Sequence, residues 1–204
     1  VTVLFGGRLA YPDHQDAETW EWDGVVWTLR ATTGPSARYN HALAYDSARG
    51  VTVLFGGYDG SMNGETWEWD GTTWTLRSTE GPSGRVDHAM TYDRVQGVTI
   101  LFGGDDGAFN AQTWAWDGTT WTLRDNRGPS RRINHGMAFD SARGAVVLFG
   151  GDDGDDDGET WEWDGAAWTL RASEGPTRRY GHAMAYDLAR GVAVMFGGDD
   201  GSRD

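Results

Sequence analysis

Short apolar runs separated by turn-forming residues recur along the whole chain. One run, Val-Thr-Val-Leu-Phe or a close variant, ends each time in a pair of glycines. These pairs begin at Gly6, Gly56, Gly103, Gly150 and Gly197. The first spacing is 50 residues and the next three are 47 residues. A fixed period of this length indicates a tandem array of one supersecondary unit.

Each repeat divides into four short strand candidates bounded by turn residues. In and after the second repeat, the sequence predicts strands over residues 66–70, 73–77, 88–93 and 98–103. The last two are almost wholly apolar, as expected of strands buried on both faces. The first alternates, with Trp67 and Trp69 on one face and Glu68 on the other. This rise in polarity predicts a radial order of inner, second, third and outer strand.

Such a unit cannot bury its faces alone, because each tryptophan brings about 150–250 Å² of surface. All twelve tryptophans fall at three repeated positions, so stacked units would bury them against one another. Four-stranded antiparallel blades arranged around an axis form a β-propeller. We therefore predict an all-β protein, a single propeller array over residues 1–204. Its repeats are 1–50, 51–97, 98–144 and 145–191, with a partial repeat over 192–204.

These motifs resemble the kelch repeat across essentially the whole chain. The resemblance rests on the glycine pair, the aromatic third strand, the tryptophan opening the fourth strand and the arginine before the inner strand. It implies kelch-like blades, nearest to bacterial kelch-like and galactose-oxidase-like propellers. The chain departs from the pattern at Trp22 and its equivalents, where many kelch repeats have tyrosine. Kelch-like rings usually hold more than four blades, so we expect a segment of a longer protein or a ring completed by self-association.

Charge and cysteine content narrow the possible partners. The net charge is −14, with seventeen arginines and no lysine, which argues against binding to nucleic acid. No run of eighteen apolar residues exists, so membrane insertion is not expected. Without cysteine there are no disulfides, thiolate metal sites or cysteine nucleophiles. The compartment stays open, with an extracellular or cell-surface bacterial location favoured over the cytoplasm.

Partner contacts are expected on one face of the array. The loops joining strand 2 to strand 3, and strand 4 to the next strand 1, should emerge together there, and kelch-like proteins commonly bind partners on this face. The loop over residues 8–18 departs from the repeat and is the first candidate for contact with a partner. The alternative is that its sequence has drifted because a surface loop tolerates change. The candidate contact residues are Arg8, Tyr11, His14, Tyr39, Arg85, Arg132 and Tyr180. For Arg85 and Arg132 a structural role is favoured, since repeated positions mostly encode the repeat.

The fourth repeat holds one candidate cation site. Asp153, Asp155 and Asp157 alternate with other residues as at the opening of a calcium loop. Asp164 stands at the twelfth position of such a loop. It would lie at the end of the third strand and not on a flanking helix, which excludes an EF-hand. A solvated acidic turn is the alternative, and no other cofactor is expected.

No asymmetric catalytic constellation stands out, because histidine and aspartate are distributed by the repeat. Without cysteine, the crosslinked copper cofactor of galactose oxidase cannot form. We therefore predict a non-catalytic propeller that serves as a protein-binding or structural scaffold through the loop face. One alternative is a glycan-binding propeller in which exposed tryptophan or tyrosine between blades stacks on sugars. Another is an accessory part of a larger secreted enzyme.

Overall fold

The computed structural model describes residues 1–8, 15–154 and 157–202 of the chain. The described residues form strands and turns without a helix, so none of them supplies a helix that could cross a membrane. The strands group into five antiparallel sheets, which we call blades 1 to 5 in chain order. Blades 2, 3 and 4 each have four strands.

The strand bounds follow the repeat. Blade 1 contains β1 (Thr2–Arg8), β2 (Gln15–Trp22) and β3 (Trp27–Ala31). Blade 2 contains β4 (Tyr39–Asp46), β5 (Val51–Tyr58), β6 (Thr66–Trp69) and β7 (Trp74–Ser78). Blade 3 contains β8 (Ala89–Asp93), β9 (Val98–Phe102), β10 (Thr113–Trp116) and β11 (Trp121–Asp125). Blade 4 contains β12 (Gly136–Asp140), β13 (Ala145–Phe149), β14 (Thr160–Trp163) and β15 (Trp168–Ala172). Blade 5 contains β16 (Tyr180–Asp187) and β17 (Val192–Asp199).

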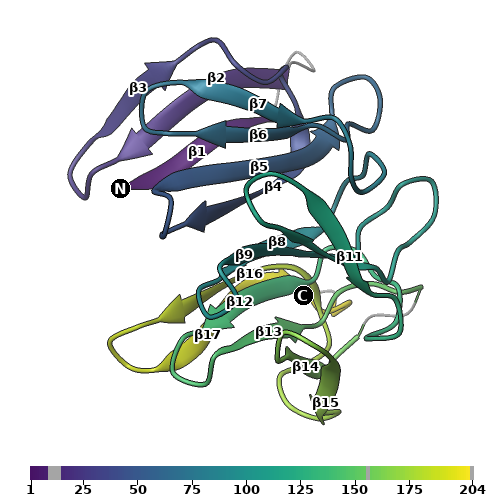
Figure 1. Cartoon of the computed structure of the whole chain (residues 1–204). Helices are drawn as coiled ribbons and strands as arrows, with labels where there is room; N and C mark the ends of the chain where they lie inside the picture. The colour runs from purple at the N-terminus through teal and green to yellow at the C-terminus, as the bar shows by residue number, and fades with distance from the viewer. Residues whose placement is uncertain (9–14, 155–156, 203–204) are drawn as a thin grey trace.

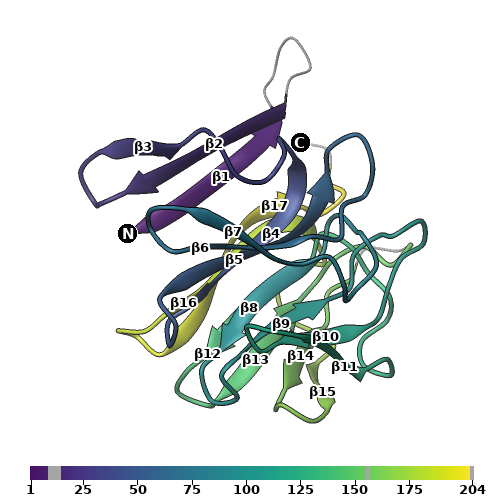
Figure 2. The ribbon, with the colours of Figure 1, turned by 45° about the horizontal axis from the view of Figure 1, so that its top comes forward.

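The order of strands within a blade confirms the order predicted from polarity. In blade 2 the sheet runs β4-β5-β6-β7, and blades 3 and 4 repeat this order. The first strands β4, β8, β12 and β16 contact one another in succession, so they form the inner side of the array. Figures 1 and 2 show the blades following one another about these inner strands. The protein is thus an all-β array of repeated antiparallel sheets in a propeller-like arrangement.

Aromatic side chains fill the space between neighbouring blades. Phe55 on β5 meets two rings from blade 3: its ring centroid lies 5.3 Å from Trp121 and 5.6 Å from His88, both edge-on. Strands β9 and β13 are buried at every position, as predicted for second strands. Edge-to-face pairs of this kind add about 0.5–1.5 kcal/mol beyond the area they bury. The blades are therefore held to each other by repeated aromatic contacts.

The glycine pair has a steric reason. Gly56 has φ +74°, and a Cβ on it would lie 2.6 Å from the carbonyl oxygen of Arg85. The same approach lets Gly57 donate its amide to that oxygen at 2.9 Å. Only glycine combines this backbone conformation with so close a neighbour.

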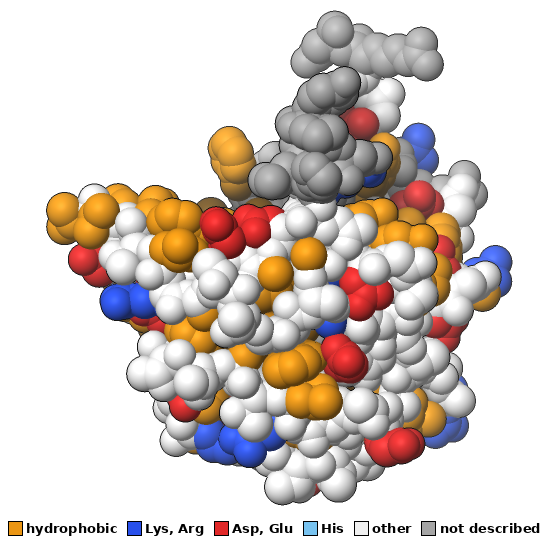
Figure 3. All heavy atoms as spheres, turned by 90° about the horizontal axis from the view of Figure 1, so that it is seen from above, with side chains coloured by type: hydrophobic (Ala, Val, Ile, Leu, Met, Phe, Trp, Pro, Cys, Tyr) orange, Lys and Arg blue, Asp and Glu red, His pale blue; other side chains and the backbone are white. Residues whose placement is uncertain are grey.

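The two end blades are incomplete, and their outward faces are exposed. Blade 1 has no inner strand and blade 5 only its first two strands, and in the described residues these two blades do not share a sheet. Phe196 on β17 is 84% exposed, whereas its equivalent Phe55 is 0% exposed. Figure 3 views the molecule from the blade 1 side, where hydrophobic patches alternate with acidic side chains; Val25 and Trp27 are among the exposed apolar residues of this blade. Self-association to complete a ring stays a prediction.

Candidate functional site

Two sets of loops meet on one face, as the topology predicted; we call it the loop face. Val86, in the connection from β7 to β8, pairs with Asp105, which follows β9, through two backbone hydrogen bonds of 3.0 and 2.9 Å. Ile133 and Asp152 repeat this pairing one blade later, at 3.0 Å for both bonds. Backbone pairing at these points makes the loop face a defined surface.

Arg85 and Arg132 lie inside the loops, with 0% exposure. Arg85 donates from Nη1 to the carbonyl of Gly103 at 2.9 Å and from Nη2 to Gln112 Oε1 at 3.0 Å. Arg132 donates in the same way to Gly150 at 2.9 Å. Burial lowers the pKa of Arg85 to about 10, which leaves it charged at neutral pH. These contacts favour the structural role over direct contact with a partner.

Histidines pack between the blades next to these arginines. His88 and His135 are 7% and 6% exposed, and neither ring nitrogen of either residue has a hydrogen-bond partner. Burial, and then the charge of Arg85, lower the pKa of His88 to about 3. Burial and Arg38 lower the pKa of His41 to about 4. The repeated histidines are therefore neutral at pH 7 and act mainly as packed aromatic rings.

A polar pocket of about 230 Å³ lies where the inner strands begin. Its lining residues are Asn40, His41, Asp87, His88, Asn134, His135, Gly181 and His182. Asn40, Asp87 and Asn134 have φ of 56°, 57° and 54°, a left-handed conformation uncommon outside glycine. The amide of Asp87 donates to the carbonyl of Asn40, and that of Asn134 to Asp87, so backbone bonds link the blades around the pocket. Burial and the neighbouring Asp105 raise the pKa of Asp87.

A second pocket, of about 190 Å³, lies between blades 1 and 2 and is lined by Arg8, Gln15, Tyr39 and Tyr58. The rings of Tyr39 and Tyr58 are 5.6 Å apart and tilted by 49°. The Arg8 guanidinium lies 5.6 Å above the Tyr39 ring, within cation–π range. Tyr58 stands where later repeats have Asp105, Asp152 and Asp199. This tyrosine pocket has no copy elsewhere in the described part of the array, and the sequence argument missed Gln15 and Tyr58.

The other candidate contacts fall in different places. Tyr180, at the start of β16, donates its hydroxyl to Asp199 Oδ2 at 3.4 Å within blade 5. Tyr11 and His14 lie outside the described residues. The structure thus brings Arg8 and Tyr39 together and places Tyr180 on a different blade.

The calcium prediction falls on a loop that the structure describes only in part, since Asp155 lies outside the described residues. The Asp157 carboxylate lies 2.6 Å from the Arg132 guanidinium and also accepts the amide of Glu159 at 2.8 Å. Burial raises the pKa of Asp157 despite that arginine. Within the described ranges, no group of three His, Cys, Asp or Glu side chains is placed to hold a metal ion. Calcium binding by Asp153, Asp155 and Asp157 therefore stays a prediction, and Asp157 also forms an ion pair with Arg132.

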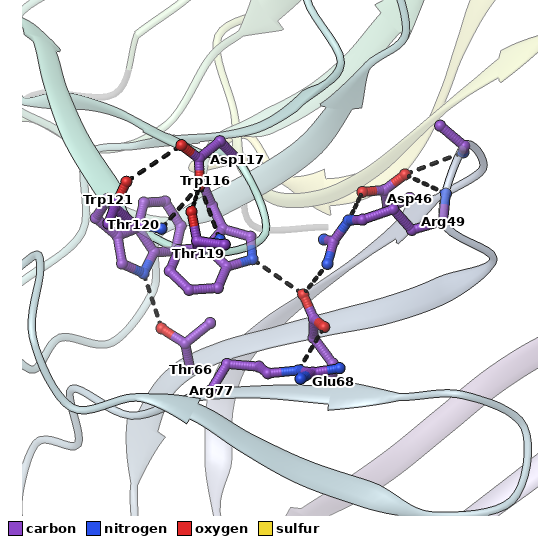
Figure 4. Close-up of polar contacts among 11 residues, drawn as sticks. Asp46, Arg49, Thr66, Glu68, Arg77, Trp116, Asp117, Thr119, Thr120 and Trp121 are labelled. Carbon is purple, nitrogen blue, oxygen red and sulfur yellow. Dashed lines mark hydrogen bonds and ion pairs between the residues drawn. The ribbon is translucent and has the colours of Figure 1, made fainter.

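The third strands carry a polar relay that the sequence argument did not find. Glu68 on β6 is 2% exposed and accepts from Arg49 at 2.6 Å, Arg77 at 2.8 Å and Trp116 Nε1 at 3.1 Å (Figure 4). Arg49 and Arg77 belong to the same blade, whereas Trp116 belongs to the next. One buried carboxylate therefore ties its own blade together and holds the neighbouring blade.

The relay recurs with one exception. Glu21 accepts from Arg30 at 2.9 Å and from Trp69 Nε1 at 3.0 Å. In blade 3, however, Ala115 stands at the glutamate position. The position equivalent to Arg49 also changes there, to Gln96. Comparing the repeats column by column would have revealed this paired change.

Comparison with known proteins supports the fold and adds little else. No protein-family model matches the chain, and no curated protein matches it. A solved structure described as "Structure of YjhT" is similar, with a TM-score of 0.64 and 12% sequence identity. The match covers 84% of this chain and 63% of that chain, so it spans less than two thirds of that protein's length. At this identity the likeness shows the fold alone.

Proposed function

We propose that the chain is a kelch-like, non-catalytic binding module that holds a partner protein on its loop face. The observation that carries the proposal is the tyrosine pocket, where residues that break the repeat come together on the face built by the two loop sets. Aromatic rings beside an arginine are the residue types enriched where protein interfaces concentrate their binding energy.

The use of the repeated polar groups supports this proposal. Arg85 and Arg132 bind backbone carbonyls, and Glu68 binds two arginines and a tryptophan. His41 and His88 have pKa values of about 4 and about 3, too low for efficient proton transfer near neutral pH. Because these repeated polar groups already stabilise the fold, we expect a partner to be recognised on the loop face.

A glycan ligand is the second candidate. Eleven of the twelve tryptophans are buried or half-buried, and Trp69, Trp116 and Trp163 are 2%, 1% and 1% exposed. The tyrosine pocket still offers two aromatic faces and a guanidinium, which can stack on and hydrogen-bond a sugar. A glycan would therefore be expected at this pocket and not at the tryptophans.

Site-specific photo-crosslinking in the source cells tests the proposal. The residue p-benzoyl-phenylalanine is placed at Tyr58 in one variant and at Tyr45 in a matched control. Tyr45 is 59% exposed and lies at the opposite end of the blade 2 sheet, next to the turn between β4 and β5. We expect a discrete protein adduct from position 58 that disappears when Arg8→Glu and Tyr39→Ala are added, and no adduct from position 45.

Equal adducts from both positions, or none from position 58, would refute a protein partner on the loop face. A glycan array run on the same chain separates the two candidates. Binding of a defined glycan that is lost in Tyr58→Ala, without any protein adduct, would replace the protein partner with a sugar.

A further inference from the structure

The polar pocket at the start of the inner strands contains side chains that the fold leaves unused. Asn40, Asp87 and Asn134 stand at the same repeat position in blades 2, 3 and 4, and all three line the pocket. Within the described residues, none of these three side chains has a hydrogen-bond or ion-pair partner. Arg85 and Arg132, two positions earlier in their repeats, bond instead to backbone carbonyls inside the loops.

Backbone hydrogen bonds hold these side chains next to one another. The amide of Asp87 donates to the carbonyl of Asn40 at 3.2 Å, and the amide of Asn134 donates to the carbonyl of Asp87 at 3.0 Å. The amide of Gly181 continues the series onto Asn134 at 2.8 Å. These amides are therefore not free to bind an anion. The pocket offers acceptors instead, since each asparagine has a side-chain oxygen and an ionised carboxylate can only accept.

Asp87 gives the pocket a negative charge. Its carboxylate is half-buried and pairs with no arginine in the part of the chain that the structure describes. Burial, and then the like charge of Asp105, raise the pKa of Asp87. A carboxylate withdrawn from water without a counter-charge is unfavourable, so a cation beside it would be stabilised. The net charge of −14 also attracts cations to the chain.

Two histidines in the same pocket add further acceptors. His88 and His135 are 7% and 6% exposed, and neither ring nitrogen of either residue has a hydrogen-bond partner. Burial lowers the pKa of both rings, that of His88 to about 3. The rings are therefore neutral at pH 7 and do not repel a cation. A neutral imidazole also keeps one nitrogen as an acceptor.

We propose that this pocket binds a primary ammonium group. A primary ammonium has three N–H donors, and three acceptor side chains stand side by side here: the Asp87 carboxylate and the amide oxygens of Asn40 and Asn134. A metal ion fits less well, because no group of three His, Cys, Asp or Glu among the described residues is placed to hold one. The pocket has about 230 Å³, and one water needs roughly 10–15 Å³. An ammonium group therefore fits together with the carbon chain that carries it.

The ammonium group belongs either to a free amine or to a lysine side chain of a partner protein. The pocket lies on the loop face, because Asp87 follows Val86 in the connection between β7 and β8. It shares no lining residue with the tyrosine pocket. The lysine source rests on the proposed function, whereas the ammonium site itself does not.

A titration of the full chain with methylammonium chloride tests the site. The ¹H–¹⁵N spectrum is followed at the backbone amide of Asp87 and at the side-chain amides of Asn40 and Asn134. Tetramethylammonium chloride at equal concentration is the control, because it carries the same charge and has no N–H donor. We expect saturable shifts of these signals with methylammonium and no saturable shift with tetramethylammonium.

Asp87→Asn is the matched variant that removes the charge. Asparagine already stands at this position in blades 2 and 4 with φ of 56° and 54°, close to the 57° of Asp87, so the variant keeps the backbone conformation. It should weaken methylammonium binding by about tenfold or more, the ratio expected for losing one charge-assisted hydrogen bond. Asn134→Asp adds a second carboxylate and should strengthen the binding. Thermal melts confirm that both variants are folded.

A second arm uses Nα-acetyl-lysine methylamide, with the norleucine analogue as its control. A response to methylammonium alone identifies a free small amine as the ligand, and a response to the lysine derivative identifies a lysine side chain. No partner protein is present, so these results are independent of the crosslinking at position 58.

Two results would overturn the proposal. One is a parent chain whose signals respond to neither ammonium compound beyond the tetramethylammonium control. The other is an Asp87→Asn protein that binds methylammonium as tightly as the parent chain does.

Discussion

Removing Glu68 is the sharpest way to test how the blades are held together. This side chain is 2% exposed and accepts three hydrogen bonds, from Arg49, Arg77 and Trp116. Glu68→Ala leaves the buried Trp116 Nε1 without an acceptor. The variant therefore creates in blade 2 the situation that Ala115 creates naturally in blade 3.

The expected loss of stability follows from these contacts. An unsatisfied buried donor costs about 1–3 kcal/mol. The arginines are 33% and 46% exposed. Solvent screens such pairs, so each adds no more than about 1 kcal/mol. We expect the free energy of unfolding to fall by about 2–4 kcal/mol, with a melting temperature lower by about 2–4 °C per kcal/mol at this chain length.

Urea denaturation followed by tryptophan fluorescence measures the change. Arg77→Ala is the control for the exposed pair alone and should cost about 1 kcal/mol or less. Glu68→Gln keeps an acceptor for Trp116 and should fall between the parent and Glu68→Ala. Arg49→Gln should cost less in the Glu68→Ala background than alone, because one of the two carboxylates that pair with Arg49 is already gone. Ordinary surface substitutions change the free energy of unfolding by up to about 0.5 kcal/mol. If Glu68→Ala lowers it by less than this, Glu68 does not hold neighbouring blades together.

Three further predictions follow. Ala115→Glu should raise the free energy of unfolding by about 1–2 kcal/mol, because Trp163 gains an acceptor; urea titration showing a loss would contradict this. His88 has a pKa of about 3 in the fold against 6.5 when unfolded, so its contribution to stability is present above pH 6.5 and is lost as the pH drops toward 3. The free energy of unfolding should therefore decrease less between pH 7 and pH 5 in His88→Phe than in the parent chain. Gly56→Ala should cost several times more than Gly50→Ala in calorimetry, since both have positive φ but only Gly56 faces an atom within 3 Å of the added carbon.

The sequence was a good guide to what repeats. The 47-residue period and the burial gradient placed the strands within one or two residues, for example β9 at Val98–Phe102 against the predicted 98–103. The strand order in each blade and the shared loop face also followed from the repeat. These features could be predicted because each residue type recurs in the same physical environment in every blade.

The candidate site was harder to predict because it depends on contacts between blades. Tyr39 lies at a position that varies from repeat to repeat, but its partner Tyr58 comes from a separate loop. Only the fold brings the centroids of the two rings to within 5.6 Å of each other. Ala115 carries no chemistry of its own, so a search for reactive residues passes over it. Its meaning appears only when Trp163, 48 positions further along, is found without the acceptor that Trp69 and Trp116 have at the same separation.

Hydrogen exchange gives the most direct test of the claim that the loop face binds a partner. It is measured on the chain alone and with the protein captured from position 58. We predict slower exchange in residues 15–18, 32–40 and 58–65, which border the tyrosine pocket on the loop face. Exchange in the turns at 46–51 and 70–73, at the opposite end of the blades, should stay unchanged. Protection confined to those turns would contradict the proposed binding face.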